Sequence, residues 1–165
     1  MRMDAQSSRG QSAGVTVIEF ELERVIHAPI EQVFARLTDI EGHNEWMPRK
    51  GSILRRTAQT SPGPPGVGTT YEDSTQVGRT PGEIVEFEPP RRLVYHWWDS
   101  TSSGKVKTEG WPGYTLESVG DAETLVRHDA RLRANGIWGL GTPVLRLMAR
   151  RERTAVLDAL EKSFA

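Results

Sequence analysis

The order of the predicted elements constrains the fold of this chain most. Extended segments fill the middle of the sequence, and one long amphipathic helix follows them, from about Thr142 to Phe164. Thr142 is a suitable N-cap and Pro143 suits the first helical position. The helix spans roughly 33 Å at 1.5 Å per residue, which is enough to cross a whole sheet. A curved sheet closed by one such helix leaves room for an enclosed space, so the order predicts a hydrophobic pocket.

Alternating apolar and charged residues predict the strands. In residues 15–26, VTVIEFELERVI, Phe20 and Leu22 fall on one face and glutamates on the other. Ala28-Pro29 then opens the first of two short helices. Further strands are expected at about 69–77, 82–88, 92–99, 106–118 and 123–133, with residues 51–57 as another candidate. Consecutive hairpins of this kind predict an antiparallel meander.

The beginning of the sequence has the composition of a tail. Residues 1–14, MRMDAQSSRGQSAG, are small and polar, so we expect a flexible segment before a single domain over residues 15–165. No apolar run approaches the roughly 18 residues that a membrane span needs. The chain contains no cysteine, which suits a reducing compartment. We therefore expect a cytoplasmic protein that does not span a membrane.

The sequence contains no motif for a metal site, a nucleotide site or a serine nucleophile. The four histidines, at positions 27, 43, 96 and 128, lack metal-ligand spacing. No phosphate-binding or dinucleotide-binding glycine motif occurs, and no GxSxG nucleophile elbow. The net charge of -1 argues against general nucleic-acid binding. We predict no metal, no cofactor and no nucleic-acid partner.

Two features leave a protein partner open. Residues 127–153 carry seven arginines against two acidic residues, a charge that can attract an acidic protein, although arginines paired with nearby acids are the commoner explanation. Trp97 and Trp98 are adjacent, so a regular strand sends their rings to opposite faces. One ring then lies outside, where the N-terminal tail or a homodimer contact would shield it.

Four stretches of the sequence resemble one superfamily. HAPIEQVFARLTDIEGHNEWMP, residues 27–48, resembles the opening of START-related (SRPBCC) proteins, with its alanine-proline start, Val-Phe pair and downstream tryptophan. PPGVGTTYEDS, EFEPPRRLVYHW and YTLESVGDAETLVRHDARL resemble later strands of its polyketide cyclase/dehydrase branch. The likeness covers about residues 16–164. It implies an α+β helix-grip fold, in which a curved antiparallel sheet wraps around a long C-terminal helix and two short helices follow strand 1.

The resemblance also implies a cavity between the sheet and the last helix that takes a lipid, a polyketide or another apolar molecule. It transfers no catalytic residue, because the branch shares no catalytic motif. Inward strand faces and the closing segment predict the cavity wall, of which about half should touch a ligand and the rest filled core. The predicted wall comprises Phe20, Leu22, Tyr71, Asp73, Val85, Phe87, Tyr95, Trp97, Tyr114, Leu116, Val126, His128, Trp138 and Met148.

Two residues of the predicted wall, His128 and Asp73, carry an imidazole and a carboxylate. His128 shares an apolar strand face, so it either orients a ligand or acts as a general base, or it is a hydrogen-bonded core residue. Asp73 points inward if its strand is regular, and a shift of one residue would expose it. Arg153 is expected to lie largely off the inward stripe of the final helix.

These patterns favour reversible binding of a small hydrophobic molecule. The first alternative is a cyclase, aromatase or dehydratase in which His128, a tyrosine or Asp73 moves protons. The second is a partner-binding protein that uses the basic surface of residues 127–153.

Overall fold

The computed structural model describes residues 14–165, and these form one antiparallel sheet with three helices. The predicted tail lies outside the described residues, apart from Gly14. The strands are β1 (Val15–Ile26), β2 (Leu54–Gln59), β3 (Thr70–Thr75), β4 (Gly78–Glu88), β5 (Arg92–Ser100), β6 (Val106–Gly120) and β7 (Glu123–Asn135). The helices are α1 (Ile30–Thr38), α2 (His43–Trp46) and α3 (Thr142–Lys162), and a 3-10 turn, η1 (Gly136–Gly139), precedes α3.

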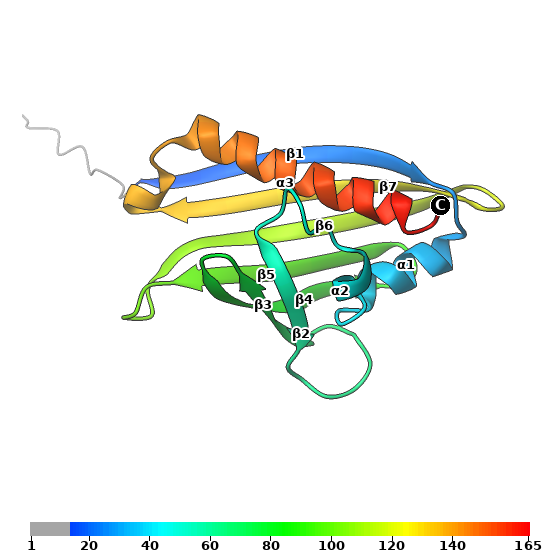
Figure 1. The fold of residues 1–165 in the computed structure, drawn as a ribbon, viewed down its shortest axis with the longest axis horizontal. Helices are drawn as coiled ribbons and strands as arrows, with labels where there is room; N and C mark the ends of the chain where they lie inside the picture. Colours follow the sequence, from blue (N-terminus) through cyan, green and yellow to red (C-terminus); the bar gives the residue numbers. More distant parts are fainter. Residues whose placement is uncertain (1–13) are drawn as a thin grey trace, which may run out of the picture.

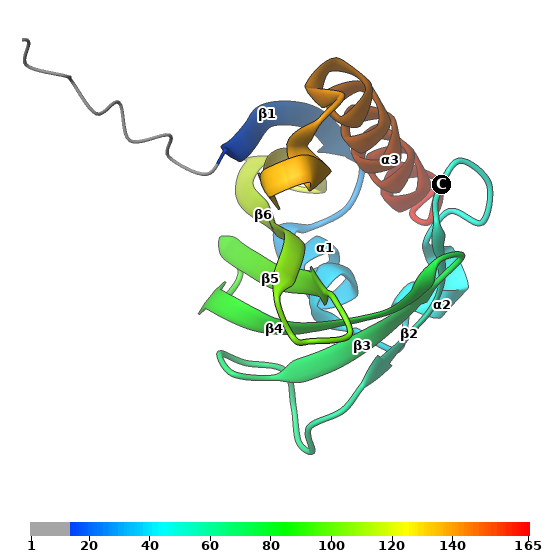
Figure 2. The same ribbon diagram turned by 90° about the vertical axis from the view of Figure 1, so that its left-hand side faces the viewer.

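The sheet curves around α3. Its strand order is β1-β7-β6-β5-β4-β3-β2, so β2 to β7 form the predicted meander and β1 closes against β7. Figure 1 shows α3 running along β1 and β7, with its C-terminal end near α1. In Figure 2 the sheet bends from β1 round to β2, and α3 lies across the open side. This is the predicted helix-grip arrangement.

The pairing of β1 with β7 shows how the sequence sets the register. The two strands pair from Val15 opposite Asn135 to Ile26 opposite Thr124 without interruption. Ile18 and Ile26 are buried on the inner face, whereas the glutamates of β1 lie outside beside arginines of β7. Exposed ion pairs contribute little to stability. The register of the two strands is therefore set by the apolar residues buried on the inner face.

Several element ends differ by one or a few residues from the predictions. Pro29 is the N-cap of α1 and not its first helical residue. Gly141, at φ 82°, occupies the N-cap position of α3, so Thr142 is already helical. β2 begins at Leu54 because the segment before it turns away to contact α3.

The C-terminal half of α3 covers a filled core. Leu157 and Leu160 are completely buried and pack with residues of α1 and the sheet, including Val33 and Leu93. Leu22 and Phe87 are partly buried against the same cluster. None of the helices in residues 14–165 is both long enough and apolar enough to cross a bilayer.

Candidate functional site

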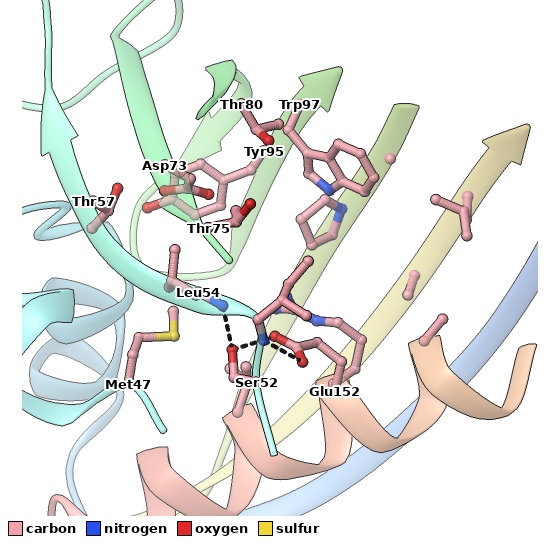
Figure 3. A pocket seen from close by; sticks show the side chains of 18 of the residues that line it. Met47, Ser52, Leu54, Thr57, Asp73, Thr75, Thr80, Tyr95, Trp97 and Glu152 are labelled. Atoms are coloured by element: carbon pink, nitrogen blue, oxygen red, sulfur yellow. Dashed lines mark hydrogen bonds between the residues drawn. The ribbon is translucent and has the colours of Figure 1, made fainter. Parts of the chain in front are cut away.

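A cavity of about 310 Å³ lies between the N-terminal half of α3 and the concave face of the sheet. This volume falls at the lower end of the range for small-molecule sites, ~300–1,000 Å³. Every strand contributes to the lining, and α3 contributes Leu145, Met148, Ala149, Glu152, Arg153 and Val156. Figure 3 shows the site, with Asp73, Thr75, Tyr95 and Trp97 presented by the sheet and Glu152 by the helix.

The structure brings half of the predicted wall to the cavity. The lining contains Phe20, Tyr71, Asp73, Tyr95, Trp97, Tyr114 and Met148. It does not contain Leu22, Val85, Phe87, Leu116, Val126, His128 and Trp138. Whether the first group contacts a ligand stays a prediction.

The residues outside the lining have four kinds of surroundings. Leu22, Phe87, Leu116 and Val126 belong to the filled core or pack against it. A register irregularity between Ile84 and Glu86 leaves Val85 half-buried and turns Ile84 into the core. Trp138, in η1, is 47% exposed at the surface. His128 lies behind the cavity wall, as described below.

Two glycines allow the rings of Tyr71 and Trp97 to lie against the sheet, where they form an aromatic floor of the cavity. Neighbouring strands align Tyr71, Gly82, Trp97 and Gly110 in one row across the sheet. A Cβ atom on Gly82 would lie 2.3 Å from Cζ of Tyr71, and one on Gly110 would lie 2.6 Å from the ring of Trp97. Both rings therefore lie flat over backbone that carries no side chain. Trp97 faces the cavity, and Trp98 lies on the outer face beside His96.

His128 orients the guanidinium group of Arg153 by a hydrogen bond. It is completely buried, and its Nδ1–H donates to the Gly113 carbonyl at 2.7 Å. Its Nε2 accepts from Nε of Arg153 at 2.7 Å, which requires the neutral tautomer because an arginine only donates. Burial, and after it the charge of Arg153, lowers the pKa of His128 well below its ordinary value. His128 is thus a hydrogen-bonded core residue and not a base facing the cavity.

Arg153 lines the cavity, which corrects the prediction that it lies off the inward stripe. Its Nη2 donates to the Tyr114 hydroxyl at 2.6 Å, and the Tyr114 ring stacks on His128 with centroids 4.3 Å apart. The cavity-lining residues of α3 follow the spacing i, i+3, i+4, i+7, i+8, i+11 from Leu145. Glu152 and Arg153 fall on this stripe, so helical spacing alone, regardless of residue type, would have found them.

Asp73 presents a carboxylate to the cavity from β3. It pairs with Thr57 of β2, and the pairing of β3 with β4 is regular, so its side chain points inward as a regular strand requires. Burial raises its pKa to about 6, against the Thr57 side chain and the charge of Arg153, which both lower it. A carboxyl group with this pKa changes its protonation state near neutral pH.

The wall next to α1 and α2 is fixed by two hydrogen bonds to one carbonyl group. The Tyr95 hydroxyl donates to the Leu37 carbonyl oxygen at 2.7 Å, and Nε2 of His43 donates to it at 2.8 Å. Burial lowers the pKa of His43 to about 4, so the ring is neutral at physiological pH. Tyr71 packs edge-to-face on Tyr95, and its hydroxyl has no partner among the described residues.

One contact ties the segment before β2 to α3 at the edge of the cavity. The Glu152 carboxylate accepts a short hydrogen bond from Oγ of Ser52 and a longer one, 3.3 Å, from the backbone N–H of Ile53 (Figure 3). Ser52 Oγ also accepts from the N–H of Leu54 at 3.0 Å. Glu152 therefore holds this segment over the cavity.

The arginines of residues 127–153 do not form one surface. Arg127, Arg131 and Arg133 lie on the outer face of the sheet and each pairs with a glutamate. Arg153 lies at the cavity, so the exposed arginines of α3 (Arg146, Arg150 and Arg151) are those left for an acidic partner. An acidic partner and a homodimer stay predictions. No group of three side chains suited to hold a metal ion occurs in the part of the chain that the structure describes.

Fold and cavity together define a helix-grip protein with an internal site. Residues 17–165 match the model of the family described as "Polyketide cyclase / dehydrase and lipid transport". The chain therefore belongs to this family, in agreement with the resemblance seen in the sequence. A search of curated proteins found no match.

Solved structures with the same fold come from varied organisms. The Zhui aromatase/cyclase from Streptomyces sp. R1128 has a TM-score of 0.68 and 15% identity, with 90% of this chain and 93% of that one covered. A START superfamily protein from Mycobacterium smegmatis has a TM-score of 0.65 and 12% identity, with 90% and 96% covered. The norcoclaurine synthase of Thalictrum flavum has a TM-score of 0.67 and 9% identity, with 92% and 96% covered. At these identities the likeness establishes the fold.

Proposed function

We propose that this protein binds a small hydrophobic molecule, such as a lipid or a polyketide, in the cavity between α3 and the sheet. The observation that carries the proposal is the cavity itself, with a volume of about 310 Å³ and walls that include Phe20, Tyr71, Trp97 and Leu145. Burying apolar ligand surface contributes about 25 cal/mol per Å². Membership of a family whose description includes lipid transport supports the same class of ligand.

The experiment is to fill the cavity. Ala149 lines it from α3, so Ala149→Trp should place an indole in the space, whereas Arg146→Trp adds the same ring at an exposed position of the same helix. We expect native mass spectrometry of freshly purified wild type and Arg146→Trp to retain a small apolar molecule that Ala149→Trp lacks. The proposal fails if none of the three retains a molecule and no apolar probe raises the melting temperature of the wild type.

A second candidate function is catalysis in the same cavity, of the cyclase or dehydratase type. It is favoured by the polar groups that face one space, namely the Asp73 carboxylate, the Tyr71 hydroxyl and the Arg153 guanidinium. A carboxyl group with a pKa of about 6 can exchange protons at neutral pH. Two solved structures of the same fold bear the names of an aromatase/cyclase and a synthase.

Asp73→Asn separates the two functions. If the protein only binds, the variant should retain ligand and no reaction product should form with either protein. If the protein is an enzyme, incubation of wild type with the retained molecule or its precursor should yield a product by mass spectrometry, and Asp73→Asn should lower the rate by about 10²-fold or more.

A further inference from the structure

Arg153 is the one cation of the cavity wall whose charge lacks an acidic partner, among the residues that the structure describes. Its Nε and Nη2 donate to His128 and to the Tyr114 hydroxyl, which are both neutral acceptors. No carboxylate forms an ion pair with it within residues 14–165, and its Nη1 has no acceptor there. The two hydrogen bonds orient the guanidinium group without neutralising it.

Other arginines of the sheet are arranged differently. Arg92 pairs with Asp129 at 2.5 Å, Arg127 with Glu23 at 3.0 Å and Arg131 with Glu19 at 3.5 Å, all on the outer face where water also solvates them. Arg153 is also only partly buried, but it has no ion-pair partner among the described residues. A cation in mainly apolar surroundings is costly unless it is paired, and the cost falls when an anion approaches it.

The nearest acidic groups of the lining do not serve as that anion. Glu152 directs its carboxylate to Ser52 and Ile53, at the edge of the cavity. Asp73 belongs to β3 and feels the charge of Arg153, but it forms no ion pair with it among the described residues. A bound anion would also avoid Asp73 and Glu152 because like charges repel, and Arg131, the other arginine of the described lining, is already paired with Glu19, so Arg153 is the group that favours it most.

We propose that the ligand is an amphiphilic acid, whose carboxylate accepts hydrogen bonds from Nη1 and Nη2 of Arg153 while its apolar body lies over Tyr71 and Trp97. Arg153 then acts as the polar anchor and His128 and Tyr114 as positioning residues that hold it. The geometry fits a planar carboxylate, which a guanidinium group binds through two parallel N–H donors. This inference rests on the proposed function and adds the charge of the ligand to it.

The test compares acids with amides of the same shape. Calorimetric titration at pH 8 of wild type with decanoate and decanamide, and with 2-naphthoate and 2-naphthamide, measures the preference for the anion in two unlike carbon skeletons. We expect at least one acid to bind about tenfold or more tightly than its amide, since hydrogen bonds to charged groups are stronger than neutral ones. In Arg153→Met the acid and its amide should bind about equally tightly, because the acid loses affinity and the amide retains it.

Two further variants separate anchoring from a general effect. Arg150→Met removes an exposed charge one turn earlier in α3 and should keep the full preference. Arg153→Lys keeps the charge and should keep part of the preference, because an ammonium group lacks the planar pair of donors. Equal affinity of acid and amide in the wild type overturns this inference and leaves the proposed function standing. Failure of all four probes to bind overturns the proposed function as well.

Discussion

The two halves of α3 close the same sheet in opposite ways. In the C-terminal half Leu157 and Leu160 are completely buried and fill the space between helix and sheet. In the N-terminal half Val144 and Met148 are 61% and 57% exposed, and the cavity lies beneath this part of the helix. Figure 1 shows the two halves as the red and orange ends of one continuous helix. Stability and binding are therefore carried by different ends of one element, so substitutions should be able to change them separately.

The largest effect should come from the filled half. Leu157→Ala removes a completely buried side chain and should lower the free energy of unfolding by about 2–5 kcal/mol. Met148→Ala, at an exposed position of the other half, should change it by no more than about 0.5 kcal/mol. Urea denaturation measures both values. Equal losses would show that the two halves do not differ in the way that their exposure indicates.

A smaller loss is expected from the aromatic floor. Gly110→Ala places a methyl group 2.6 Å from the ring of Trp97, so the ring must move, and we expect a loss of about 1–3 kcal/mol. Tryptophan fluorescence should shift with it. Gly66→Ala is the matched control, because a Cβ atom there meets nothing within 4 Å. An unchanged emission spectrum and unchanged stability in Gly110→Ala would contradict the close approach of ring and backbone.

The third prediction concerns pH. The pKa of Asp73 lies at about 6 in the folded protein against an ordinary value of 3.8, so ionisation favours unfolding as pH rises through this window. Asp73→Asn removes that penalty, and the variant should gain up to about 3 kcal/mol over wild type at pH 8. The gain should vanish below pH ~4, where the carboxyl group is protonated in both states.

Thermal unfolding of both proteins from pH 4 to pH 8 measures this difference. His43 contributes with the opposite sign in both proteins, because its pKa of about 4 makes folded protein less stable as pH falls below 6.5. That contribution cancels in the comparison of wild type with Asp73→Asn. A difference between the two proteins that stays constant with pH would show that Asp73 ionises normally.

The smallest effect on stability should come from the contact at the edge of the cavity. Ser52→Ala removes the hydrogen bond to Glu152 and should cost about 1 kcal/mol. A fluorescent ligand should dissociate faster from this variant than from wild type in stopped-flow experiments. Ser103→Ala, in the exposed turn after β5, should leave both quantities unchanged. Equal dissociation rates in Ser52→Ala and wild type would mean that this segment does not retain the ligand.

Much of the fold could be predicted because it depends on local patterns. Alternation identified β1 and the meander, and the Pro-Gly breaks placed most turns within a few residues. The predicted starts of α1 and α3 differ from the observed ones by one residue, since Pro29 and Thr142 suit two neighbouring positions at a helix start. The start of β2 depends on the contact between Ser52 and Glu152, which are 100 residues apart.

Residues that line the cavity can be predicted where the strands are regular, and cannot where a strand is irregular or the residue lies on a helix. Tyr71 with Asp73, and Tyr95 with Trp97, lie two residues apart on regular strands, and all four line the cavity. The irregularity after Ile84 changes the face that Val85 occupies, and no local signal marks it. The rule that charged residues usually face water predicts Arg153 outside, yet its helical position is inward. Alternation predicts His128 on an inner face, as observed, but only the three-dimensional structure shows that Arg153 lies between it and the cavity.

The row in which Gly82 and Gly110 alternate with Tyr71 and Trp97 has a consequence for how such proteins diverge. The depth of the chamber depends on two positions that bear only a hydrogen atom. Replacing either by a larger residue would lift a ring toward α3 and shrink the chamber, with no change to α3 itself. Relatives could thus be adapted to slimmer or bulkier guests by single exchanges in the floor, while the packed end continues to hold the molecule together.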